Sequence, residues 1–159
     1  MTEDNALNPE RLRCPEDYTV VLDQMRIMAG REERNIELYE YLMRLTMNQM
    51  VAQARIVTNH RVLRRNRDTA RTNLEILNET YRALTNEALR PVRLEFTRPV
   101  SLRQGVERAF FNEIEDAELY REMMLNTPVG PLRDRLFILY SNSRTNVDRN
   151  NLLYTRASL

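Results

Sequence analysis

The 159-residue chain is long enough for one domain, and its 24 basic and 23 acidic side chains leave a formal net charge of +1. This balance argues against a nucleic-acid or anionic-membrane partner, because such binders carry a basic surplus or stripe. A single Cys, no run of about 18 apolar residues and no secretory signal pattern predict a cytoplasmic protein without internal disulfides or membrane spans.

The first half of the chain predicts a flexible N-terminal arm followed by two helices. Residues 1–17 are polar and contain two prolines, which is typical of an arm. From Tyr18 past Met43 apolar residues recur at three- and four-residue steps, which indicates an amphipathic helix. A second helix is predicted over about 48–84, where five apolar residues fall seven apart: Ile56, Leu63, Ala70, Leu77 and Leu84.

The second half predicts a crossover and two further helices. Residues 85–100 contain two prolines and alternating apolar residues, so we expect an extended connection. A capping box opens a third helix over 101–125, with Ser101 as the N-cap and Gln104 reaching back. A proline-rich break then leads into a fourth helix over 131–154. Two helical hairpins joined by one long crossover predict an all-α four-helix bundle, and its methionines are expected to fill the core.

An internal repeat links the two halves. Glu32 and Glu113 each stand seven residues before a tyrosine, Tyr39 and Tyr120 respectively. In the second and fourth helices a small residue followed by Arg-Thr-Asn stands eight residues before another tyrosine: Ala70-Arg71-Thr72-Asn73 before Tyr81, and Ser143-Arg144-Thr145-Asn146 before Tyr154. Both halves keep the same order, which chance rarely produces.

This arrangement resembles the ferritin-like superfamily, most closely the small ferritin-like and spore-coat-type proteins of endospore-forming bacteria. The resemblance covers residues 18–156. The segment PVSLRQGVERAFFNEIEDAELYREMM is similar to the third-helix region of the spore-associated members, and SRTNVDRNNLLYT is similar to their fourth helix. The resemblance implies a ferritin-like bundle. In members of this superfamily, helices 1 and 3 each supply one glutamate to a metal site. In the same proteins, helices 2 and 4 each supply a Glu-x-x-His pair, and the six side chains hold two iron or manganese ions.

The positions that would carry the metal ligands depart from this pattern. Glu32 and Glu113 match the two single glutamates. The two Glu-x-x-His pairs fall on residues that cannot replace them: Ala70 with Asn73, and Ser143 with Asn146. Iron and manganese need several anionic oxygens and imidazole nitrogens, which these four residues lack. The resemblance therefore implies a vestigial site without a metal cofactor.

Two buried carboxyls without a metal need other partners or must be protonated. Arginine suits a carboxylate, and Arg67 falls on the apolar seam of the second helix, with Arg71 and Arg144 as alternatives. We expect an Arg–Glu–Asn–Tyr hydrogen-bond network, including Tyr39 and Tyr120, in place of the metal cluster. In the alternative, both glutamates lie on solvated helix faces.

The favoured function is a non-enzymatic structural protein that forms a homo-oligomer or joins other coat proteins in a spore coat. The composition fits this role, because all 24 basic residues are arginine and no primary amine remains on a side chain. Codon bias against lysine would also suppress asparagine, which occurs 15 times. Cys14 lies in the polar arm, where it is either an intermolecular link or an idle thiol.

Two other functions remain open. One is a metal-binding ferritin-like oxidoreductase with a shifted or mononuclear iron or manganese site. Such a site would combine Glu32 and Glu113 with His60 and with carboxylates further along the helices: Glu37, Glu115 or Asp116. The other is a small-ligand pocket in the vacated core. The lone histidine is more often a satisfied or half-exposed side chain than a metal ligand.

Overall fold

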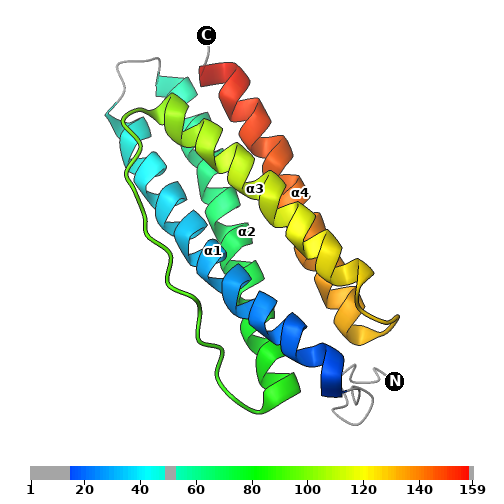
Figure 1. Ribbon diagram of the computed structural model, residues 1–159. Coiled ribbons are helices and arrows are strands. Elements are labelled where there is room, and N and C mark those ends of the chain that lie inside the picture. The colour runs from blue at the N-terminus through cyan, green and yellow to red at the C-terminus, as the bar shows by residue number, and fades with distance from the viewer. Residues whose placement is uncertain (1–14, 49–52, 158–159) are drawn as a thin grey trace, which may run out of the picture.

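The computed structural model describes residues 15–48 and 53–157, and within these ranges it contains four helices and no strand. They are α1 (Pro15–Met47), α2 (Gln53–Thr85), α3 (Leu102–Leu125) and α4 (Pro131–Ala157) (Figure 1). The predicted all-α four-helix bundle is confirmed. No helix in the described ranges combines the length and apolarity needed to cross a membrane.

The helices form two antiparallel hairpins that pack against each other. α1 packs against α2 and α3, and α4 packs against the same two helices. In Figure 1, α2 and α3 run in the same direction, because the crossover over 86–101 travels alongside the bundle before α3 begins. This arrangement brings one helix from each half of the sequence repeat against its counterpart.

The helix ends differ slightly from the predicted ones. α1 begins at Pro15, three residues before the predicted start, because proline suits the first turn of a helix. α4 continues to Ala157, three residues beyond the predicted end. Residues 1–14, with Cys14, and the predicted start of the second helix at 49–52 lie outside the described residues.

The core consists of two apolar clusters with buried polar side chains between them. One cluster gathers residues such as Met25, Leu77 and Leu136, and the other gathers residues such as Leu42 and Leu63. The three central positions of the predicted seven-residue pattern are completely buried, and four methionines fill the core as predicted: Met25, Met28, Met43 and Met123. Buried glutamate, aspartate and asparagine side chains form a third layer.

The capping box at the start of α3 is confirmed with one change. The Ser101 hydroxyl accepts the backbone N–H of Gln104 at 3.1 Å. The Gln104 carboxamide reaches back to the N–H of Val100 at 2.8 Å, one residue before the cap. These bonds satisfy two backbone donors where the crossover enters the helix.

The crossover docks on α1 at a glycine. The N–H of Val92 donates to the carbonyl of Arg26 at 2.9 Å, and the Arg26 guanidinium donates to the carbonyl of Arg90 at 3.2 Å. A Cβ atom added at Gly30 would lie 1.9 Å from the Val92 carbonyl oxygen. Only glycine therefore allows the backbone of the crossover to approach this helix.

Gly30→Ala should lower the free energy of unfolding by about 1–3 kcal/mol, because the new methyl group must push the crossover away from α1. Urea denaturation followed by circular dichroism measures the change. Glu33→Ala, at an exposed position of the same helix, is the control and should be nearly neutral. Equal midpoints for the two variants would contradict the close docking.

Candidate functional site: a buried carboxyl–amide–phenol layer

The two repeated glutamates form the centre of the polar layer. Glu32 on α1 and Glu113 on α3 are both 0% exposed, so the alternative that they lie on solvated faces is wrong. Each sits between the two apolar clusters, in contact with side chains from several helices. The layer therefore has to accommodate two carboxyl groups away from water.

Each glutamate is bound by the tyrosine of the other half. The Tyr120 hydroxyl donates to Glu32 Oε1 at 2.8 Å, and the Tyr39 hydroxyl donates to Glu113 Oε1 at 2.7 Å. α1 and α3 thus exchange two equivalent hydrogen bonds. The seven-residue spacing between glutamate and tyrosine corresponds to two helical turns, which places both side chains on the same helix face.

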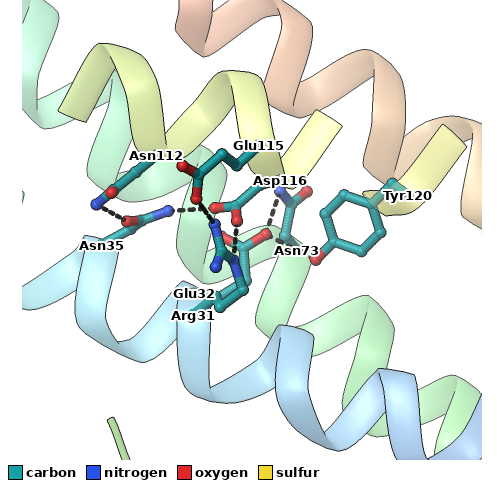
Figure 2. A network of polar contacts seen from close by, with 8 residues as sticks. All are labelled: Arg31, Glu32, Asn35, Asn73, Asn112, Glu115, Asp116 and Tyr120. Carbon is teal, nitrogen blue, oxygen red and sulfur yellow. Dashed lines mark hydrogen bonds and ion pairs between the residues drawn. The ribbon is translucent and has the colours of Figure 1, made fainter. Parts of the chain in front are cut away.

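The repeated asparagines complete the set. Asn73 on α2 donates from Nδ2 to Glu32 Oε1 at 2.9 Å, and Asn146 on α4 donates from Nδ2 to Glu113 Oε1 at 2.9 Å. Figure 2 shows the first of these bonds beside the Tyr120 ring. Each carboxyl oxygen Oε1 therefore accepts one phenol and one amide, and the two halves of the chain build the same arrangement.

The two small residues of the repeat make no such bond. Ala70 is completely buried in the core and has no polar side-chain atom. Ser143 is also completely buried, and its hydroxyl has no hydrogen-bond partner among the described residues, although it lies near enough to lower the pKa of Glu113. These positions supply space to the layer and no strong ligand.

Further asparagines support the inner bonds. Asn150 donates to the Tyr39 hydroxyl at 2.9 Å, and Asn66 donates to Asn150 Oδ1 at 2.8 Å. On the other side, Asn142 donates to Asn73 Oδ1 at 2.8 Å. The amide groups that touch the glutamates and Tyr39 are thus oriented by partners of their own, which a buried polar network requires.

An ion-paired cluster lies one turn from Glu113. Asp116 is completely buried and accepts from the Arg31 guanidinium and from Asn35 Nδ2, the latter at 2.7 Å (Figure 2). The same arginine reaches Glu115 at 2.8 Å, and Asn112 donates to Asn35 Oδ1 at 3.1 Å. This cluster joins α1 to α3 beside the layer.

The structure does not bring the expected arginines to the glutamates. Arg67 pairs with Asp68 at 2.7 Å, and Arg71 pairs with Glu40 at 2.8 Å. Arg144 is exposed on α4. Acidic partners near the helix surface hold Arg67 and Arg71, and these ion pairs avoid the cost of bringing a guanidinium into a buried site.

Two other arginines contact the network, and the sequence pattern did not indicate them. Arg31 immediately precedes Glu32 and pairs with Asp116. Arg149 donates from Nη1 to Asn146 Oδ1 at 3.2 Å and to Thr69 Oγ1 at 3.0 Å. Neither forms an ion pair with a central glutamate in the described ranges, so phenol and amide donors bind these carboxyls in place of a cation.

Burial dominates the titration of the layer. It raises the pKa of Glu113 to about 8, and the charge of Asp116 adds to the rise, while bonds from Tyr39 and Asn146 oppose it. Burial also raises the pKa of Glu32 well above its ordinary value, and Glu113 adds to that rise. At neutral pH the layer therefore favours neutral carboxyl groups.

The remaining residues proposed for a shifted metal site are dispersed. His60 is half-buried and precedes Asn66 by six residues, or about 9 Å along α2. Glu37 and Glu115 are exposed. Over residues 15–48 and 53–157, no three His, Cys, Asp or Glu side chains are grouped so that they could hold a metal ion.

Comparisons with protein-family models, with curated proteins and with solved structures find no match to this chain. The donor set itself does not fit a dinuclear iron or manganese centre. Oε1 of Glu32 and of Glu113 already accepts two hydrogen bonds, and the Asn73 and Asn146 amides point N–H groups at these oxygens. A cation beside them would face donors where it needs anionic or lone-pair ligands.

Removing the two phenol hydroxyls should have unequal effects. The Tyr39 hydroxyl makes two buried hydrogen bonds, to Glu113 and from Asn150, whereas the Tyr120 hydroxyl makes one, to Glu32. Tyr39→Phe should lower the free energy of unfolding by about 2 kcal/mol and Tyr120→Phe by about 1 kcal/mol. Chemical denaturation measures both, and a larger loss for Tyr120→Phe would contradict this network.

The wild-type pH dependence follows from the raised pKa of Glu113. Because its pKa rises from 4.5 to about 8 on folding, the native state binds the proton more tightly than the unfolded state. The resulting stability is complete below pH 4.5 and is lost as the pH rises to about 8.

Glu113→Gln keeps a neutral acceptor and should remove this loss. Its stability should match the wild type at pH 5 and exceed it at pH 8, as measured by urea denaturation at both values. Glu118→Gln, at an exposed position of α3, is the control and should follow the wild type. A Glu113→Gln variant that is less stable than the wild type at pH 8 would show that the carboxyl is ionised and compensated.

Proposed function

We propose that this protein is a non-enzymatic structural protein with a ferritin-like bundle, in which hydrogen bonds replace a dinuclear metal centre. One observation carries the proposal. Asn73 and Asn146, at the positions where the resemblance places histidine ligands, donate to the two carboxyls that the resemblance assigns to the metal. Residues at the positions where the resemblance places metal ligands are instead hydrogen-bonded to one another.

The layer is suited to fixing one arrangement of the helices. Its central members Glu32, Asn73, Glu113 and Asn146 are all 0% exposed, so a substrate has no direct access to them. A shift of one helix by a turn would leave several buried polar atoms without partners, each at a cost of about 1–3 kcal/mol. The network therefore supports a scaffold with a unique packing more than it supports a reactive centre.

Assembly with other chains is the second part of the proposal. Several large apolar side chains are about half-exposed on α3 and α4: Phe111 and Leu125, and Phe137, Ile138 and Leu152. Apolar and aromatic surface of this kind favours protein contacts. We infer self-association or incorporation into a larger shell, and the spore-coat setting and its coat-protein partners rest on the family resemblance.

A metal-binding oxidoreductase is the competing function, and one observation favours it. Glu32 Oε2 and Glu113 Oε2 are buried and have no hydrogen-bond partner among the described residues. A single iron or manganese ion could use such oxygens, although the surrounding amides supply donors. The two functions therefore differ in the metal content of the purified protein.

Elemental analysis of protein prepared without chelator tests the proposal. The wild type should contain far less than one equivalent of iron or manganese. A variant with Ala70→Glu, Asn73→His, Ser143→Glu and Asn146→His restores the pattern that the resemblance implies, and it should take up about two equivalents. One or two equivalents in the wild type would overturn the structural function, and a restored variant that folds without taking up metal would overturn the vestigial site.

Size-exclusion chromatography with light scattering tests the assembly. The chain has a mass of 19.0 kDa, and self-association predicts a particle of at least twice that mass. A charged substitution in the exposed apolar surface, Phe137→Glu, should reduce the particle size, whereas Thr145→Glu on the same helix should not. A monomer at every concentration would overturn self-association.

A further inference from the structure

A second feature of the molecule is a pocket outside the polar layer. It has a volume of about 310 Å³ and lies between α1, α3 and the crossover. Arg34 and Leu38 of α1, Arg108 and Asn112 of α3, and Phe96 of the crossover line it. This volume is at the lower end of the range found for small-molecule sites.

Arg34 brings a cation with an unsatisfied buried donor to this pocket. Its Nε atom is buried and has no hydrogen-bond partner, and the guanidinium forms no ion pair in the part of the chain that the structure describes. The neighbouring Arg31, by contrast, holds two carboxylates. Burial lowers the pKa of Arg34, and the charge of Arg31 adds to this effect, while the charges of Asp116 and Glu115 oppose it without forming an ion pair with Arg34 in the described ranges. A buried donor without a partner is costly, and an anion would satisfy it.

Arg108 supplies a second cation from the opposite helix. Its guanidinium donates to the Thr97 carbonyl, which ties the arginine to the crossover at the edge of the pocket. A guanidinium has five N–H donors, so one such bond leaves others for a ligand. The charge of Arg108 also acts on Arg34, and Glu95 is the one acidic side chain in the lining. The pocket therefore carries a net positive charge.

Leu38 and Phe96 form the apolar part of the wall. Leu38 is buried, and Phe96 is half-buried with its ring edge against Tyr41, at a centroid distance of 6.1 Å. The packing of Phe96 fixes one side of the pocket. A ligand that matches both walls needs a negatively charged group joined to a small apolar body.

We propose that this pocket binds a small organic anion, with its carboxylate or phosphate between Arg34 and Arg108 and its apolar part against Leu38 and Phe96. The pocket lies outside the polar layer, and binding there does not rest on the proposed structural function. It gives the bundle a ligand-binding activity at the junction where the crossover packs on α1 and α3.

Isothermal titration calorimetry on the full chain tests this site with four probes: phenyl phosphate, benzoate, inorganic phosphate and benzyl alcohol. At least one of the two aromatic anions should bind more tightly than inorganic phosphate, and benzyl alcohol should not bind. A preference for phenyl phosphate or for benzoate identifies the charged group. Inorganic phosphate binding as tightly as both aromatic anions, or benzyl alcohol binding as tightly as either, would overturn the proposal.

Three variants locate the binding. Arg34→Gln should weaken the binding of the preferred anion by about tenfold or more, because it removes a charge-assisted contact. Arg121→Gln, at an exposed position of α3, is the matched control and should change nothing. Glu95→Gln removes the opposing charge at an exposed position and should strengthen binding, a gain that misfolding cannot imitate. No binding by the wild type, or no response to Arg34→Gln and Glu95→Gln, would overturn the proposal.

Discussion

The burial of two carboxyl groups in the middle of the bundle is the constraint on which the rest of the structure depends. Glu32 and Glu113 lie where water cannot reach them, and a charge there is expensive unless it is neutralised. The two helices exchange hydrogen bonds, since Tyr39 of α1 donates to the glutamate of α3 and Tyr120 of α3 donates to the glutamate of α1. Sliding either helix would break both bonds together, so the carboxyls determine the register of the central helix pair.

The apolar packing is organised around this constraint. The polar layer separates two apolar clusters, and each cluster closes one part of the bundle. Apolar contacts alone tolerate small shifts between helices, whereas a hydrogen-bonded layer allows one alignment. The docking of the crossover at Gly30 adds a second fixed point, because backbone meets backbone there. Stability therefore comes mainly from the clusters and specificity from the layer and the crossover.

Periodicity predicted the helices because it reports which side chains face inward, and the Ser-x-x-Gln pattern predicted the capping box because its side chains can bond the free backbone N–H groups. The internal repeat and the family resemblance together predicted that Glu32, Glu113, Asn73 and Asn146 belong to one site, because the resemblance places the repeated residues around a common centre. The sequence pattern did not predict which arginines contact the network. Arg67 sits on the apolar seam but bends to its neighbour Asp68, while Arg31 pairs with Asp116, 85 residues away in the chain. Long side chains can reach in several directions, so their partners depend on the tertiary packing and leave no signal in sequence spacing.

The arrangement of charged side chains links the polar layer to the pocket beside Arg34. Because the central carboxyls are bound by phenol and amide donors and favour the neutral form, they need no arginine beside them. Arg31 can then hold Asp116 and Glu115, and Arg34, one turn further along α1, forms no ion pair with any described residue. Arg34 therefore presents a buried Nε donor without a partner at the pocket, and an anion that enters the pocket can accept its hydrogen bond.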